Sequence, residues 1–271
     1  MKLEINKYNK LILFTILFYA VYGVLLLIVG RFDFPITIYI PISESINGFP
    51  QFFPTTIGFA ALFELTANTP LVILFFYLIY NTIKKFEFKN QIKRINILKF
   101  MVYLTIAFTI LGIGIHFTAN LFNTIKIQPT NPDPNDVLLY WLDEIVGHHL
   151  IHIGLFGFFV CMMIFENNKI QSPMDSIETR GYPIWGFLIG GGFGAALAEG
   201  QCTLTFLIIY SIAIIAIFIF KRFRYPFDFK EKRLLWFNLF FYIGNLTFII
   251  VYGIISVLLG YYFFSQPHII F

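Results

Sequence analysis

Charged residues are scarce in this chain of 271 residues, where aspartate, glutamate, lysine and arginine together make up 13%. Soluble domains carry about 25% charged residues, so the composition excludes an ordinary soluble fold. Hydrophobic residues make up 58% of the chain, and its mean hydropathy is +0.77. Apolar stretches of about 20 residues, each long enough to cross a bilayer, recur along the sequence. The composition therefore predicts a single integral-membrane helical domain over residues 1–271.

Cysteine and histidine are also scarce, and several common catalytic motifs are absent. Two cysteines, Cys161 and Cys202, do not suggest a disulfide framework. The chain contains neither H-E-x-x-H nor G-x-S-x-G. The net charge of +4 comes from basic residues spread over several loops, so no nucleic-acid partner is expected.

Seven apolar segments predict an all-α, polytopic transmembrane helix bundle. Between them lie turn-forming loops at 128–136 and 167–176. An outer segment, 31–54, is rich in proline and aromatic residues and is expected to lie along the membrane interface, as a plain connector or as a lid over a substrate. The predicted helices are 11–30, 55–83, 98–123, 136–165, 183–199, 202–220 and 234–263.

The basic residues predict the orientation of this bundle. All 19 except Arg31 and Lys126 fall on one side of the seven predicted helices. Cytoplasmic loops of membrane proteins are enriched in lysine and arginine. The sequence therefore predicts a multi-pass protein of the cell membrane with a cytoplasmic N-terminus and an outer C-terminus.

Polar residues from four predicted helices converge on one depth. At about 1.5 Å rise per residue, most of them fall in the outer half of the bilayer. Ionisable groups inside a membrane are costly and usually face the bundle interior. We therefore expect an outward-facing polar site that includes Glu64, His116, Asn120, Glu144, His148, His152 and Glu199.

The stretch DEIVGHHLIHIG, residues 143–154, holds most of the candidate ligands. In an α-helix, Glu144, His148 and His152 form one stripe, with Asp143 and His149 on its flanks. One helix can offer only two of these groups to one ion, because residues eight apart are about 12 Å apart. The pair His148–His152 is favoured, Glu144–His148 competes with it, and an i, i+3 pair of His149 with His152 is also open.

Other helices would complete a metal site. His116 would close it from the third helix, and Glu64 or Glu199 would supply an oxygen. The segments ELTAN and HFTAN place Asn68 and Asn120 one turn after Glu64 and His116, where they could hydrogen-bond to the ligands, as could Asp143. Three imidazoles with a carboxylate suit Zn, Cu or non-haem Fe.

Two further features concern helix packing. Gly186, Gly190 and Gly194 are spaced four apart and predict a close helix–helix contact, for which Gly147, Gly154 and Gly157 are candidate partners. Pro70 predicts a kink in the second helix.

Three functions fit this pattern. The first is a metal-dependent membrane enzyme, a hydrolase or oxidoreductase, that acts on a lipid or small apolar substrate with Glu144 and Glu64 as catalytic carboxylates. The second is an ion- or proton-coupled transporter in which the same groups titrate in turn. The third is an accessory subunit of a membrane complex whose polar layer is structural.

Overall fold

A computed structural model describes residues 7–31, 35–46, 49–58, 62–85, 95–125, 134–168, 172–199, 201–223 and 229–259. Most of the predicted loop 128–136 lies outside the described residues. The end of the predicted helix 234–263 also lies outside them. So do the side chains of Glu64, Asn120 and Glu199.

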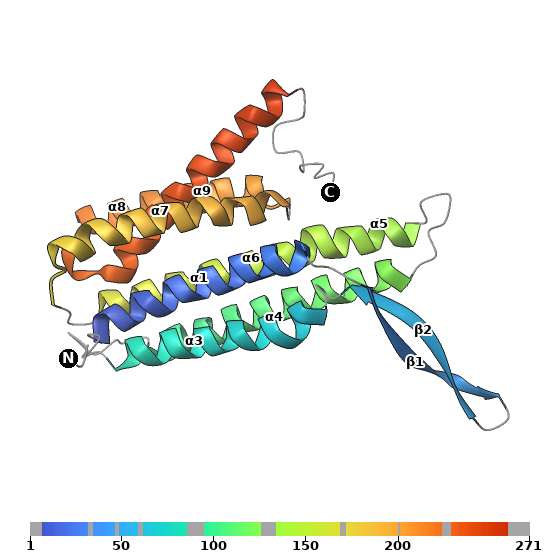
Figure 1. Ribbon diagram of the computed structural model, residues 1–271. Coiled ribbons are helices and arrows are strands. Elements are labelled where there is room, and N and C mark those ends of the chain that lie inside the picture. The colour runs from blue at the N-terminus through green and yellow to red at the C-terminus, as the bar shows by residue number, and fades with distance from the viewer. Residues whose placement is uncertain are drawn as a thin grey trace.

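The predicted helix bundle is confirmed (Figure 1). Two π-helical turns, η1 (Glu64–Asn68) and η2 (Trp141–Gly147), adjoin α-helices, and a short 3-10 turn, η3 (Phe229–Glu231), precedes the last helix. With each π-turn joined to its neighbours, all seven predicted helices are present. The α-helices are α1 (Lys7–Arg31), α3 (Thr69–Lys84), α4 (Ile95–Ile125), α5 (Pro134–Tyr140), α6 (His148–Asn167), α7 (Ser176–Glu199), α8 (Thr203–Phe223) and α9 (Arg233–Leu258).

Five helical spans in the described chain are long and apolar enough to cross a membrane, which indicates a multi-pass membrane protein. They are Thr66–Lys84, Ile95–Ala119, Val137–Asn167, Thr203–Arg222 and Arg233–Leu258. Of the two remaining predicted spans, α1 contributes a shorter apolar stretch, Asn9–Tyr22. The predicted orientation of the termini stays a prediction.

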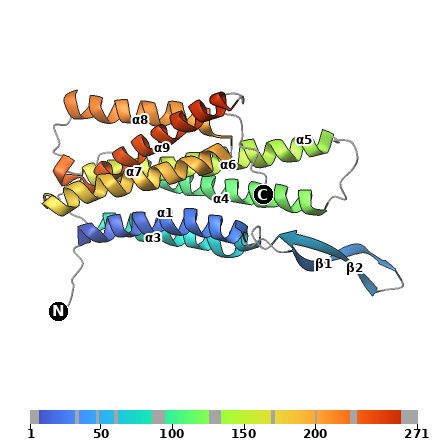
Figure 2. The same cartoon turned by 45° about the horizontal axis from the view of Figure 1, so that its top comes forward.

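The segment between the first two helices forms a β-hairpin that the sequence analysis did not foresee. Strand β1 (Pro35–Ile46) pairs antiparallel with β2 (Phe49–Gly58), and the hairpin extends away from the helices (Figures 1 and 2). The predicted start of the second helix at residue 55 is wrong, because Thr55 and Thr56 belong to β2. β-Branched and aromatic residues favour strands, and prolines are tolerated in the outer strands of a sheet. Glu64 therefore lies in the first turn of its helix instead of more than two turns after its predicted start.

Helix α7 packs against α9 through the predicted glycine face. A Cβ on Gly186 or Gly190 would collide with the backbone carbonyl of Phe237 or Phe241, respectively. Gly244 of α9 approaches α7 in the same way. Absence of side chains at these positions lets the two backbones approach closely, as in other membrane helix pairs. The close contact is confirmed, but its partner is α9 and not the glycines of α6.

An aromatic core joins α1, α3 and α6. The rings of Phe76 and Phe158 stack with their centroids 4.0 Å apart, and Phe18 lies 5.7 Å from Phe159. Tyr19 stacks on Phe241 at 4.5 Å and so extends the core to α9. This core fixes α6, the helix that carries three of the histidines.

Candidate metal centre

Glycines in η2 and α6 let α6 pack closely against α4. A Cβ on Gly154 would lie 2.7 Å from the backbone nitrogen of Thr109, and Gly157 meets Thr105. A Cβ on Gly147 would lie 3.2 Å from the Cβ of His116. The residues predicted to face α7 thus face α4. Their small size places His116 directly beside the turn that contains Asp143.

The π-turn η2 decides which acidic side chain faces His116. The backbone N–H of His148 donates to the carbonyl of Asp143, five residues earlier, so Asp143 lies one turn before His148. In an uninterrupted α-helix these two residues would be about 140° apart around the axis, and Glu144 would share the face of His148. The extra residue in the turn therefore brings Asp143, in place of Glu144, into the group with His148. π-Turns inside α-helices are frequent at functional sites.

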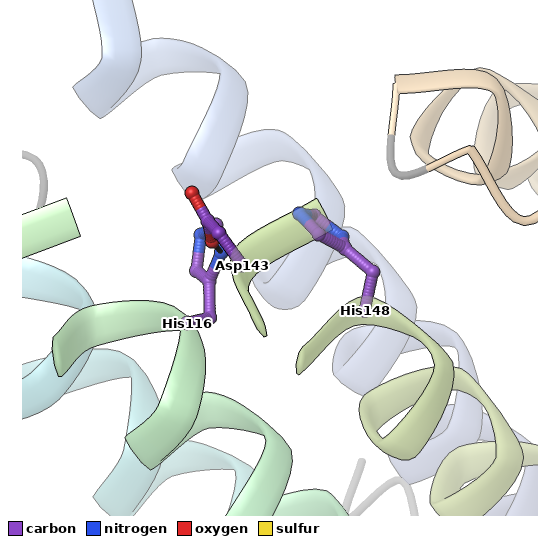
Figure 3. Close-up of side chains that lie close together, drawn as sticks. All are labelled: His116, Asp143 and His148. Carbon is purple, nitrogen blue, oxygen red and sulfur yellow. Dashed lines mark hydrogen bonds and ion pairs between the residues drawn. The ribbon is translucent and has the colours of Figure 1, made fainter. Parts of the chain in front are cut away.

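His116, Asp143 and His148 form a compact group (Figure 3). Each offers a potential ligand atom, and the three atoms lie within 4.8 Å of one another. His116 Nδ1 bonds to Asp143 Oδ1, and the His116 and His148 rings meet edge to face with centroids 4.6 Å apart. Asp143 is 6% exposed, so its carboxylate has little access to bulk solvent. A buried carboxylate is stable only when it is paired, and His116 is its partner here.

His152 lies deeper in the bundle than this group. Its ring is parallel to that of His148 with centroids 6.1 Å apart, and it contacts Phe193 and Phe206 edge-on at 5.3 and 5.7 Å. The residue is buried, and its Nδ1 has no hydrogen-bond partner among the described residues. His152 therefore adjoins the group without being one of its three members.

His149 forms its hydrogen bonds outside this group, to Ile145 and Thr205. Its Nδ1 bonds to the carbonyl of Ile145 at 2.7 Å, which makes Nδ1 the protonated nitrogen. Its Nε2 then accepts a hydrogen bond from the Thr205 hydroxyl at 3.0 Å, and the Cys202 thiol lies 3.4 Å from Nδ1. These contacts tie α6 to the start of α8, and both nitrogens are occupied outside the group.

Among the described residues, the predicted site residues Glu144 and Asn68 are not members of the three-residue group. Glu144 lies near enough to Cys202, at the start of α8, to act on its thiol electrostatically. Asn68 is buried in the π-turn η1, and neither atom of its side-chain amide has a partner in the described chain. Glu64, Asn120 and Glu199 were also predicted to belong to the site, and their side chains lie outside the described set.

The three grouped residues have the donor set of a transition-metal site. Two imidazoles and one carboxylate hold non-haem Fe(II) in many oxygenases, and two histidines with a carboxylate hold Zn in several hydrolases. Three protein ligands leave coordination positions for water or a substrate. The bond between His116 and Asp143 also fits a second arrangement, in which Asp143 orients His116 and the other ring nitrogen binds the ion. Both arrangements use the same three residues.

Asp143 was predicted only to hydrogen-bond to the ligands, and its place in the group was not predicted. The sequence DE at 143–144 offers two adjacent carboxylates, and only the π-turn selects between them. A second polar cluster was missed altogether. It joins the end of α6 to the start of α9, where Glu166, Lys232 and Arg233 are buried. Their proximity depends on tertiary structure, since 65 or more residues separate Glu166 from the other two.

No family of known proteins matches this chain, and neither a curated protein nor a solved structure shows significant similarity to it.

Proposed function

We propose that His116, Asp143 and His148 bind one transition-metal ion, Zn or Fe in first place, and that the protein is a metal-dependent enzyme of the cell membrane. The observation that carries the proposal is the convergence of two imidazoles and a carboxylate from two helices within 4.8 Å. Copper is the third candidate, because Cu(II) also accepts imidazole and carboxylate donors.

The surroundings support an apolar or lipid substrate. Asp143 and His148 lie in the span Val137–Asn167 and His116 lies in the span Ile95–Ala119, and both spans are apolar enough to cross a membrane. A bound metal would supply Lewis acidity or an activated water. Asp143 would orient His116, and Glu144, on the same π-turn, is an additional carboxylate that could take up a proton. Glu64 keeps its role as a second candidate from the sequence alone.

Metal analysis of matched histidine variants tests the proposal. The purified protein should contain close to one transition-metal ion per chain by mass spectrometry, and His148→Ala should lose it. His149→Ala removes the adjacent imidazole, whose nitrogens both bond elsewhere, and should keep the metal. A His148→Ala protein with full metal content would exclude this site.

A proton path is the second candidate, and the position of His152 favours it. The imidazoles of His116 and His148 are 4.6 Å apart between centroids, and those of His148 and His152 are 6.1 Å apart. The series ends at the buried ring of His152. Histidine chains of this kind serve as proton relays in membrane proteins. Proton uptake by proteoliposomes that His152→Phe abolishes, in a protein without metal, would favour this function over the enzyme.

The third function is an accessory subunit in which the polar layer only holds helices together. This function predicts that His148→Ala lowers stability and leaves the metal content unchanged. His148→Ala would then leave Asp143 or His116 with a poorer network, at a cost of about 1–3 kcal/mol. A lowered melting temperature with no change in metal content would support it.

A further inference from the structure

Helix α9 presents a row of buried polar side chains that the metal group does not use. Asn238, Tyr242 and Asn245 are spaced four and three residues apart, so they lie on one face of the helix. Their exposed fractions are 0%, 1% and 0%. In a helix that also exposes Ile250, Val251 and Ile254 as its apolar surface, such a row is costly unless something binds to it.

Each of the three side chains has one polar atom without a partner in the described chain. The amide nitrogens of Asn238 and Asn245 donate to the carbonyls four residues earlier, Leu234 and Phe241, at 2.9 and 3.0 Å. This fixes the orientation of both amides, because the reverse orientation would oppose two oxygens. The amide oxygens are therefore free acceptors, and the Tyr242 hydroxyl between them is free to donate and to accept.

We propose that this face of α9 binds a row of internal water molecules in the membrane-spanning part of the protein. Water matches all three atoms, since it donates to the amide oxygens and exchanges hydrogen bonds with the phenol. A single cation does not match them. The two amide oxygens belong to residues seven positions apart, about 10 Å along the helix, so one ion cannot bind both.

A column of aromatic rings separates this row from the histidines. Tyr242 stacks on Tyr210 with centroids 5.0 Å apart, Tyr210 lies 5.3 Å from Phe206, and Phe206 lies 5.7 Å from His152. The Nδ1 atom of His152, on the other side of Phe206, is another buried polar atom without a partner among the described residues. Waters on α9 would thus form a second polar strip in the bundle, which the apolar ring of Phe206 separates from His152. The proposal does not depend on a metal at His148.

Hydroxyl-radical footprinting of the whole protein in nanodiscs tests it. Radicals produced by a short X-ray pulse arise at bound water, so a buried tyrosine beside ordered water is labelled although bulk solvent does not reach it. Phe241 is the internal control because it is adjacent in sequence, 2% exposed, and packed against Tyr19 and Phe193. After correction for intrinsic reactivity, we expect several-fold faster labelling of Tyr242 than of Phe241. Equal rates would overturn the proposal.

Two leucine variants give an independent measurement. Asn238→Leu and Asn245→Leu roughly preserve the side-chain volume but remove the acceptor oxygens. Each variant should reduce the labelling of Tyr242. Its melting temperature should be equal to that of the wild type or below it. Thr247→Val, which removes an exposed hydroxyl from the same helix, should not change the labelling. If the amide oxygens bound nothing, the leucine variants would instead raise the melting temperature, and that rise would contradict the row of waters even in a protein with full metal content.

Discussion

Gly147 lies against His116, with a Cβ at position 147 placed 3.2 Å from both the Cβ and the backbone nitrogen of the histidine. This contact brings a ligand of α4 to the π-turn of the neighbouring helix. It also means that a residue without any functional group controls the geometry of the proposed metal centre.

Gly147→Ala should therefore weaken metal binding without removing a ligand. The added methyl group overpacks the contact, and overpacking costs about 1–3 kcal/mol, or roughly 5- to 140-fold in affinity. Gly114→Ala is a matched control, because it lies two residues from His116 and its Cβ would meet nothing within 4 Å. Metal affinity of both variants can be measured by competition with a chromogenic chelator. Equal affinities would show that the 3.2 Å contact does not position His116.

The register of the π-turn predicts different outcomes for two adjacent carboxylates. Asp143→Asn should lower metal content sharply, since it removes the charge that bonds to His116. Glu144→Gln should retain the metal, because Glu144 is not one of the three grouped residues. Metal content by mass spectrometry distinguishes them. The reverse result would indicate an ordinary α-helical register in the working protein.

The fold was largely predictable from the sequence because long apolar segments have few alternatives in a membrane. The histidines of the site were predictable for a related reason, since ionisable side chains in such segments must converge to be stable. The choice of Asp143 over Glu144 was not, because a π-turn depends on packing that no periodic pattern records. The hairpin at 35–58 was not predicted, because a segment rich in proline and aromatic residues also fits an irregular connector along the membrane interface.

The orientation rests on the distribution of basic residues and has its own test. The loop around Asn131 should be outside, so a cysteine introduced there should react with a membrane-impermeant maleimide added to intact cells. The native thiols, Cys161 and Cys202, are buried and should stay unlabelled. Labelling only after the cytoplasmic face is opened would reverse the predicted topology.

The contact of α7 with α9 provides a prediction about stability. Gly190→Ala should destabilise the protein, because the methyl group would overlap the Phe241 carbonyl and force the two backbones apart. Gly192→Ala lies in the same helix with nothing within 4 Å of its Cβ, and alanine is favoured over glycine in a helix by about 1 kcal/mol. Melting temperatures in detergent should fall for the first variant and be unchanged or rise for the second. A fall of equal size in both would mean that helix propensity and not the close contact decides stability.

The last prediction concerns the junction of α6 with α9. The Glu166 carboxylate accepts hydrogen bonds from the backbone N–H groups of Leu234 and Leu235, at 2.8 and 2.9 Å, and so caps the first turn of α9. In return, the Lys232 ammonium donates to the carbonyls of Glu166 and Asn167 at the end of α6. Each helix end thus satisfies the unpaired backbone groups of the other, and the charges complement both helix dipoles.

Glu166→Ala should therefore destabilise the protein strongly. It leaves two buried N–H groups without acceptors and removes the negative charge beside Lys232, at a cost on the order of 3–5 kcal/mol. Glu166→Gln keeps one acceptor oxygen, so its loss should be intermediate. Chemical unfolding in mixed micelles can rank the two variants against the wild type. Because the junction lies at the far end of α6 from His148, the folded fraction of each variant should keep its metal, and loss of metal at unchanged stability would contradict this separation of structural and functional polar clusters.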